Sequence, residues 1–270
     1  MRADIDVVVV TYQSGQRISG CLEALRASEA CRSCVVDNGS DDDTLRCLDE
    51  LGIEPLVLSA NPGYAVAANR GASLGSAGYL AFVNPDCLVP PHFWRDALRL
   101  LADHPTACVV PRRLIKPGMV QLGRQPGYSS LKLLGDIFFD NYFNLGLGRL
   151  LRRLPGYHAP DWFWPHGACL VMSRRWFDTL GGMDESFPMY MGDVVLGRRM
   201  RELGGVILES GIDVVHLEGE GAAVTPARRL ALLNAGRTAY AERFHGAALA
   251  WAMRLLAWPG FTLRRLLVFR

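Results

Sequence analysis

The chain has 270 residues, half of them hydrophobic and 21% charged, a composition that indicates a globular protein with a sizeable core. Its 29 Lys and Arg against 27 Asp and Glu are too evenly balanced to predict a nucleic-acid partner. The seven cysteines include a single C-x-x-C, which favours a reduced, cytosolic setting over a disulfide framework or a zinc site.

The first 110 residues alternate short apolar runs with helical patterns. Strands are expected at 5–10, 34–36, 56–58, 80–83 and 108–110, and helices at 18–27, after 41–44, up to residue 72 and at 91–101. This alternation predicts an α/β fold with a doubly wound, mostly parallel sheet, in which ligands bind at the carboxyl ends of the strands. The chain lacks G-x-G-x-x-G and G-K-[ST] after its strands, which argues against a dinucleotide-binding or P-loop enzyme.

Three polar residues, Thr11, Asp37 and Asp86, fall at the ends of predicted strands. The strand before Asp86 ends abruptly in Asn84-Pro85-Asp86, which an ordinary turn would also explain. A carboxylate at the end of a buried strand is costly unless it is compensated, and a divalent cation on a nucleotide diphosphate would compensate it. Because the three residues share one edge of the predicted sheet, the metal-diphosphate interpretation is preferred.

The character of the chain changes at about 123–161, where dense apolar positions between 131 and 147 are followed by Arg149, Arg152 and Arg153. A lid, an acceptor platform, a membrane-facing surface and a helical hairpin packed on the core all fit this pattern. Further on, strands are expected at 167–172, 206–208 and 214–215, with helices at 174–180 and 193–203, and the last strand ends at His216.

The tail from residue 226 is predicted to be helical and is strongly amphipathic from His245, with Trp and Leu interspersed with Arg. This pattern suits a helix lying on an anionic membrane surface, although docking onto the rest of the chain would also explain it. No signal peptide and no run of about 18 uncharged apolar residues are found. We therefore expect a cytoplasmic protein that associates peripherally with the inner face of the cell membrane.

Ordered sequence blocks run through most of the chain. They are VVVVTY (7–12), VVDNGS (35–40), NPGYA (61–65), ANRG (68–71), VNPD (83–86), GACLV (167–171), GGMDESF (181–187), MYMGD (189–193) and VH (215–216). In this order they resemble the inverting glycosyltransferase family 2 enzymes of the GT-A fold, especially the rhamnosyltransferase-like branch. The resemblance implies a GT-A domain over 1–225, with a nucleotide-sugar half at about 1–110 and an acceptor half at about 111–225, and a helical appendage over 226–270.

The resemblance also implies roles for individual residues. The nucleotide-sugar donor would be bound by Thr11, Tyr12, Asp37, Asn69 and Asp86. The acceptor side would include Trp164, Gly167, Asp184 and Glu185. Asp86 and His216 would hold Mg²⁺ or Mn²⁺, which prefer oxygen ligands and bridge phosphates.

The catalytic base implied by the resemblance is Asp193. The family motif has the form Glu-Asp-x-Asp-Leu, whereas this chain has Gly192 in place of the Glu and Val195 in place of the second Asp. Asp193 is expected at a helix N-terminus, which favours its anionic form, but an ordinary N-cap would have the same position. The resemblance implies that an acceptor hydroxyl displaces the nucleotide while this carboxylate removes its proton.

The favoured donor is dTDP-rhamnose, by resemblance to the nearest branch, and the acceptor a bacterial polysaccharide or a lipid-linked glycan. The damaged acidic motif leaves an alternative, a catalytically impaired homologue that works as a glycan-binding or scaffold protein. A nucleotidyltransferase is disfavoured, because residues 11–16 do not form the Gly-rich basic loop that grips a triphosphate.

Overall fold

The computed structural model describes residues 4–139, 161–217 and 225–268, with the side chains of 138–139, 226 and 258–268 left aside. The chain divides into two compact units, Met1–Gln125 with Phe163–Thr225, and Pro126–Trp162 with Pro226–Arg270. The division assigns residues 126–162 to the same unit as the C-terminal helices, whereas the sequence analysis places this segment in the acceptor half.

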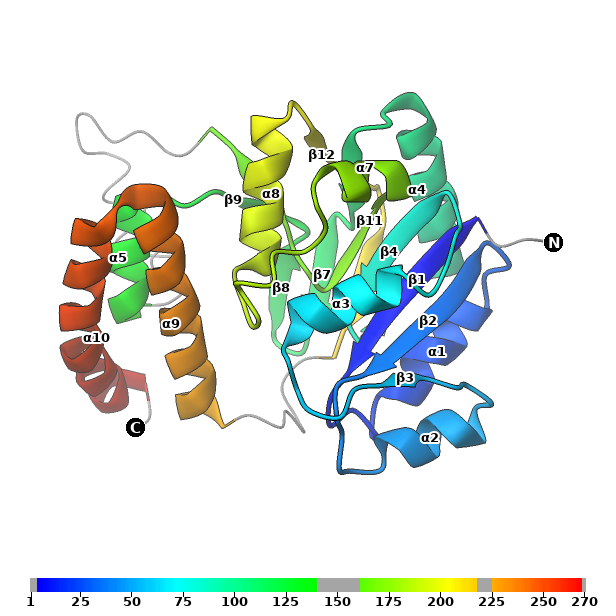
Figure 1. The fold of residues 1–270 in the computed structure, drawn as a ribbon, viewed down its shortest axis with the longest axis horizontal. Helices are drawn as coiled ribbons and strands as arrows, with labels where there is room; N and C mark the ends of the chain where they lie inside the picture. Colours follow the sequence, from blue (N-terminus) through cyan, green and yellow to red (C-terminus); the bar gives the residue numbers. More distant parts are fainter. Residues whose placement is uncertain (1–3, 140–160, 218–224, 269–270) are drawn as a thin grey trace. The chain divides into compact units, whose positions relative to one another are not determined.

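A seven-stranded sheet forms the centre of the first unit, in the order β12-β6-β11-β4-β1-β2-β3 (Figure 1). Its strands are β1 (Ile5–Thr11), β2 (Cys31–Asp37), β3 (Leu56–Val57), β4 (Tyr79–Val83), β6 (Ala107–Val110), β11 (Cys169–Ser173) and β12 (Val206–Glu209). Neighbouring strands are parallel except at β11, which is antiparallel to both β4 and β6. The predicted mostly parallel α/β fold is confirmed.

Helices cover both faces of this sheet, because β1 is buried along its whole length and needs apolar partners on either side. One core contains β1 side chains with helices α1 (Ile18–Arg26) and α4 (Pro91–Asp103). The other contains side chains of α3 (Tyr64–Ala72), α7 (Arg174–Thr179) and α8 (Gly192–Glu202). The remaining helix of this arrangement, α2 (Thr44–Glu50), follows β2.

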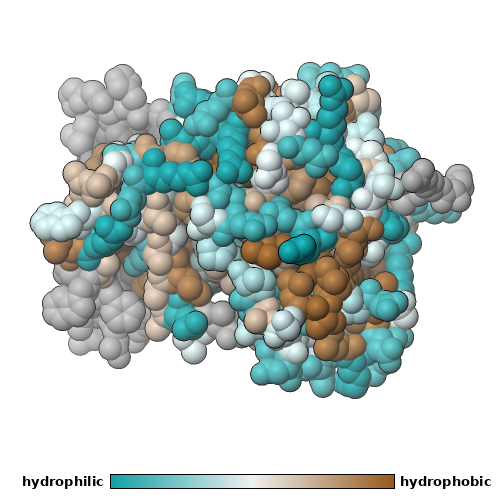
Figure 2. Space-filling view, viewed as in Figure 1, coloured by the Kyte–Doolittle hydropathy of each residue, from teal (hydrophilic) through white to brown (hydrophobic). Residues whose placement is uncertain are grey.

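The approach of α3 to the sheet depends on Gly71. A Cβ atom at this position would lie 2.4 Å from Cγ1 of Val8 and 3.1 Å from Cγ2 of Val36. The helix therefore packs on β1 and β2 at a distance that only glycine permits. Beside α3, Figure 2 shows an apolar area over the strands, and at this end of the sheet Leu56 and Val57 of the short edge strand β3 are exposed.

A second, four-stranded sheet has the order β5-β13-β7-β8. It consists of β5 (Cys87–Leu88), β13 (Asp213–His216), β7 (Arg113–Lys116) and β8 (Met119–Leu122), while β9 (Arg124–Pro126) pairs with β10 (Phe163–Pro165). The sequence analysis misses β5 and β7–β10, because these strands are short and carry charged or turn residues. Antiparallel pairing of β13 with β5 places His216 opposite Cys87, immediately after Asp86.

The second unit contains three described helices, α5 (Ser130–Phe139), α9 (Pro226–His245) and α10 (Ala247–Val268). Leu133, Ile137, Tyr240, Ala250 and Met253 are almost completely buried in it. The helical prediction for the tail holds. Among the described residues, no helix is both long and apolar enough to cross a membrane. The apolar and basic positions predicted between 140 and 160 lie outside the described residues.

Candidate active site

Thr11 and Asp37 meet where β1 and β2 end, because the parallel register pairs them directly. The Thr11 hydroxyl donates to Oδ1 of Asp37 over 2.7 Å, and the hydroxyl and backbone N–H of Ser40 donate to the same carboxylate over 2.6 and 2.8 Å. Both residues are fully buried. The Asp37 carboxylate, which Thr11 also contacts, holds the turn after β2 in place. An incoming nucleotide would therefore first meet this turn and not the side chains of Thr11 and Asp37.

The loop after β1 is fastened to the loop after β2 by backbone N–H groups. Gln13 donates to the Ser40 hydroxyl over 2.9 Å, and Ser14 donates to the Thr44 hydroxyl over 2.7 Å. The backbone of Gln13 has a φ of 54°, in the left-handed region that few non-glycine residues adopt. Tyr12 of this loop is 37% exposed, so among the predicted donor-binding residues at this edge its side chain is the most accessible.

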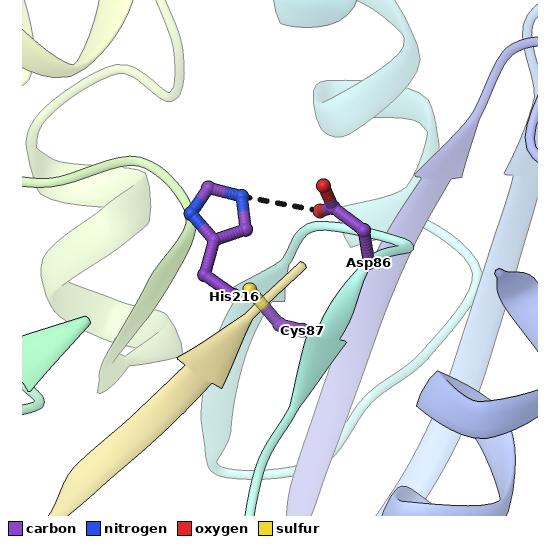
Figure 3. Close-up of side chains that lie close together, drawn as sticks. All are labelled: Asp86, Cys87 and His216. Carbon is purple, nitrogen blue, oxygen red and sulfur yellow. Dashed lines mark ion pairs between the residues drawn. The ribbon is translucent and has the colours of Figure 1, made fainter. Parts of the chain in front are cut away.

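Asp86 and His216 form a close pair at the neighbouring strand end. The Asn84-Pro85-Asp86 segment is a tight turn, in which the N–H of Cys87 donates to the carbonyl of Asn84 over 3.0 Å. The turn aims the Asp86 carboxylate at His216, with Oδ1 lying 3.2 Å from Nε2 (Figure 3). The N–H of Leu217 donates to the Asp86 carbonyl over 2.9 Å and holds the two segments together. The sequence segment is thus both a turn and part of a site.

The surroundings of Asp86 favour its ionised form. Burial raises the pKa of Asp86, but the hydrogen bond and charge of His216, together with the charge of Arg17, outweigh it, and the net pKa lies below the ordinary value. Two neighbouring ligands of an octahedral ion at about 2.1 Å lie about 3.0 Å apart. The 3.2 Å between Oδ1 and Nε2 matches this separation. The residues present therefore fit a divalent metal.

Asp193 lies in the first turn of α8 and is half-buried. Its Oδ2 accepts the N–H of Gly167 over 3.0 Å and its Oδ1 accepts the N–H of Val194 over 2.9 Å. Burial raises its pKa to about 6, although these two hydrogen bonds pull the pKa down. The N-cap position belongs to Met191, so Asp193 is not an ordinary N-cap.

The backbone before Asp193 is strained. Tyr190 and Met191 have φ values of 61° and 65°, which non-glycine residues rarely adopt twice in succession. Strain of this kind persists only where the surroundings enforce it, and it gathers at functional sites. At the two altered motif positions, a Cβ on Gly192 would meet only the Phe187 carbonyl at 3.8 Å, whereas Val195 is fully buried. The first position is therefore open, and the second is part of the apolar interior.

Asn69, Asp184 and Glu185 hold the loop before α8. The amide group of Asn69 donates to the Met183 carbonyl and to Oε1 of Glu185, both over 2.9 Å, and Oδ1 accepts the Met183 N–H over 2.9 Å. Arg199 donates to Asp184 over 2.6 Å. Both amide hydrogens of Asn69 are thus occupied, and the predicted contact of Asn69 with the nucleotide has no support in this arrangement.

The loop 164–168 connects Asp193 with the Asp86–His216 pair. Gly167 binds Asp193, and the carbonyl of Ala168 accepts the N–H of Asn84 over 2.9 Å. Between them, the His166 ring stacks on Trp164 at 6.2 Å and meets His216 edge-on at 6.2 Å. The two predicted acceptor-side residues of this loop, Trp164 and Gly167, therefore lie at the site.

His166 and Tyr64 are site residues that the sequence analysis misses. Burial, with the nearby charges of Lys116 and His216, lowers the pKa of His166 to about 3, so the imidazole is neutral. Burial, with the charge of Asp193, raises the pKa of the Tyr64 hydroxyl. Tyr64 belongs to the 61–65 block and could have been found there, whereas no pattern in the sequence distinguishes His166.

Residues 6–180 match the sequence profile described as glycosyl transferase family 2. The chain belongs to this family. A curated relative from Mycobacterium tuberculosis, N-acetylglucosaminyl-diphospho-decaprenol L-rhamnosyltransferase, is 28% identical over 93% of this chain and 89% of its own length. Validoxylamine A glucosyltransferase from Streptomyces hygroscopicus is 28% identical over 74% of this chain and 52% of its length.

Solved structures share the fold of this family 2 member. The mannosyltransferase PcManGT from Pyrobaculum calidifontis, in complex with GDP-Man and Mn²⁺, has a TM-score of 0.60 at 16% identity and covers 96% of this chain and 70% of that one. S. aureus TarS with UDP-GlcNAc has a TM-score of 0.57 at 13% identity and covers 98% of this chain and 73% of that one. The predicted GT-A fold is confirmed, and the chain is a glycosyltransferase that takes its sugar from a nucleotide donor.

Proposed function

We propose that this enzyme transfers rhamnose from dTDP-rhamnose to a hydroxyl group of a bacterial glycan or lipid-linked acceptor, with inversion and with a divalent metal. The observation that carries the proposed transfer reaction is the state of Asp193. It is a half-buried carboxylate with a raised pKa of about 6, held by Gly167 beside the strand ends where family 2 enzymes bind their donors. A base with a pKa near the working pH is the most effective one.

In the proposed reaction, the acceptor oxygen attacks C1 of the sugar. The new C1–O bond forms as the bond from C1 to the diphosphate breaks, and the hydroxyl proton passes to Asp193. The N–H groups of Gly167 and Val194 fix the orientation of the carboxylate before the acceptor arrives. Because the His166 imidazole is neutral, it adds no positive charge that would compete for the Asp193 carboxylate.

Asp86 and His216 would hold the metal. A divalent ion supplies positive charge that stabilises the departing diphosphate. Mg²⁺ and Mn²⁺ both suit a carboxylate and an imidazole 3.2 Å apart. The Mn²⁺ in the complex of the solved mannosyltransferase supports the proposal that this enzyme uses a divalent metal.

The donor and acceptor are proposed from the curated relative, which is named as a rhamnosyltransferase acting on a lipid-linked sugar and aligns with nearly the whole chain. Such an acceptor lies in a membrane, and the second unit has a surface suited to meeting one. Trp251 and Leu255, one helical turn apart on α10, are 63% and 56% exposed, while Ala250 and Met253 are buried. We propose peripheral binding at the inner face of the cell membrane through this helix.

A donor panel tests the proposed function. Transfer to a diphospho-lipid-linked N-acetylglucosamine is measured with dTDP-rhamnose, UDP- and GDP-sugars, each with Mn²⁺, Mg²⁺ or EDTA. The expected result is rhamnosyl transfer that EDTA abolishes and Mn²⁺ restores. Undiminished transfer in EDTA contradicts the metal proposal, and preference for another sugar contradicts the donor.

The alternative function is a glycan-binding or scaffold protein that has lost activity. Gly192 and Val195 favour it, because the companion acids of the family motif are absent. Nucleotide-sugar binding in calorimetry, without turnover of any donor on any acceptor of the panel, would establish this alternative. The open space at Gly192 and the intact hydrogen bonds of Asp193 favour the enzyme.

A further inference from the structure

A third potential ligand, Cys87, lies beside the proposed metal pair. Asp86, Cys87 and His216 each offer one ligand atom, and these three atoms lie within 4.8 Å of one another. Cys87 and His216 are directly paired across β5 and β13, so their side chains leave the same face of the sheet. Figure 3 shows the sulfur on the strand side of the line that joins the imidazole and the Asp86 carboxylate.

The three groups supply oxygen, nitrogen and sulfur, which is not a donor set for Mg²⁺ or Mn²⁺ alone. Hard ions use the carboxylate and tolerate the imidazole, whereas thiolate selects zinc and other soft ions. Ligands of tetrahedral zinc at about 2.0–2.3 Å lie about 3.3–3.8 Å apart, so a contraction of about 1 Å would bring all three onto one ion.

The Cys87 thiol makes a weak hydrogen bond, which coordination of such an ion would replace. It is fully buried, and its Sγ donates to the Ala168 carbonyl over 3.4 Å. On coordination the S–H bond breaks, the S–metal bond forms and the proton passes to solvent. Mn²⁺ or Mg²⁺ would leave the thiol protonated and bonded to Ala168.

We propose that Asp86, Cys87 and His216 together form a binding site for thiophilic divalent ions, Zn²⁺ or Cd²⁺, which displace the catalytic metal and inhibit the enzyme. The binding part stands on the geometry of the three residues. The inhibition part rests on the proposed function. Cys87 then sets which metals the site accepts, and removing its sulfur makes the site selective for hard ions.

Cobalt is the probe for the binding part, because a thiolate bound to Co²⁺ produces a sulfur-to-metal charge-transfer band in the ultraviolet. The full chain is titrated with Co²⁺, and Zn²⁺ is then added to displace it. The expected result is a charge-transfer band in the wild type that is absent in Cys87→Ser. The matched control is Cys21→Ser, which removes another fully buried thiol, bonded to the Asn84 carbonyl over 3.5 Å, outside the three-residue set.

The affinity of each variant for each ion completes the test. Cys87→Ser is expected to weaken Zn²⁺ binding by more than about tenfold, the lower end of what even an outer-shell partner costs, and to leave Mn²⁺ binding unchanged. Cys87→Ala gives the same readout if the serine variant folds poorly, with circular dichroism as the check. A wild type without the band, or a band retained in Cys87→Ser, overturns the proposal.

The inhibition part has a separate readout. Zn²⁺ is expected to inhibit transfer in the wild type and in Cys21→Ser, and to inhibit Cys87→Ser only at more than about tenfold higher concentration. Equal inhibition of the wild type, Cys21→Ser and Cys87→Ser overturns the inhibition part of the proposal. If no transfer is found under any condition but the cobalt band behaves as expected, the proposed function fails and the binding site stands.

Discussion

A buried carboxylate, Asp6, and a half-buried one, Asp193, lie at opposite ends of the main sheet, and their surroundings differ in kind. Asp6, near the start of β1, accepts from Arg32 over 2.8 Å, from Arg174 over 2.6 Å and from the N–H of Ala77 over 2.8 Å. Asp193, beside the strand ends, accepts from two backbone N–H groups, and among the described residues no arginine or lysine pairs with it. Two arginines compensate the charge of Asp6, whereas the charge of Asp193 has no such partner among the described residues, and this carboxylate can take up a proton.

The largest expected effect comes from Asp193→Asn. Transfer should fall by about 10²–10⁴-fold, the usual contribution of a general base, with donor affinity retained. The free energy of unfolding at pH 7 should change little, because the lost charge is unfavourable in the folded state. Single-turnover transfer and calorimetric binding of the donor measure the two quantities. Full activity in this variant would show that another group removes the proton.

Asp6→Ala should lower the stability of the protein and leave its activity unchanged, the opposite of the result expected for Asp193→Asn. Removing the partner of two arginines is expected to lower the free energy of unfolding by about 3 kcal/mol, the low end of the cost of breaking a buried pair, because Arg32 is half-exposed. Transfer per folded molecule should stay the same. Urea denaturation gives the first number, with Asp43→Ala, which removes an exposed pair with Arg46, as a control that should change it by under about 1 kcal/mol. If Asp6→Ala lost activity without losing stability, the proposed contrast between Asp6 and Asp193 would be wrong.

The pH dependence sharpens the comparison further. Asp193 has a folded-state pKa raised to about 6, above its value in the unfolded chain, so the folded state binds more protons between about pH 4 and pH 6. Its contribution to stability is therefore lost as the pH rises through this window, while the rate of transfer rises as the base ionises. The stability of Asp193→Asn relative to wild type should increase from pH 4 to pH 6, and a flat difference would argue against the raised pKa.

The smallest effect is expected from Gly192→Glu, which restores one acid of the family motif. The space is open, and because Gly192 is the first residue of α8, replacing it should change the free energy of unfolding by less than the roughly 1 kcal/mol that glycine costs in a helix interior. The new carboxylate next to Asp193 should raise the pKa of Asp193 and move the rate profile to higher pH. Thermal melting and the pH profile of transfer test both points. A profile that moves to lower pH would show that the two groups do not interact as like charges.

The fold and the ends of the main strands could be predicted from the sequence, because buried parallel strands and their helices have distinct apolar patterns. The second sheet could not, since β5 has two residues, and β7, which contains Arg113 and Lys116, is joined to β8 by a turn of only two residues. Contacts between residues far apart in the sequence could not be predicted either. Asn69 lies within a family block, but its partners Met183 and Glu185 lie more than 100 residues away, and only the folded chain shows that they occupy its amide.

The reversed direction of β11 has a consequence for how this family can diversify. Parallel strands have their carboxyl ends at the ligand edge of the sheet, whereas an antiparallel strand has its amino end there. The residues that follow β1, β2 and β4 can therefore stay unchanged while the segment that enters β11 varies. In this chain that segment follows β10 and contains His166 and Gly167. Insertions there would leave the register of β1, β2 and β4 unchanged.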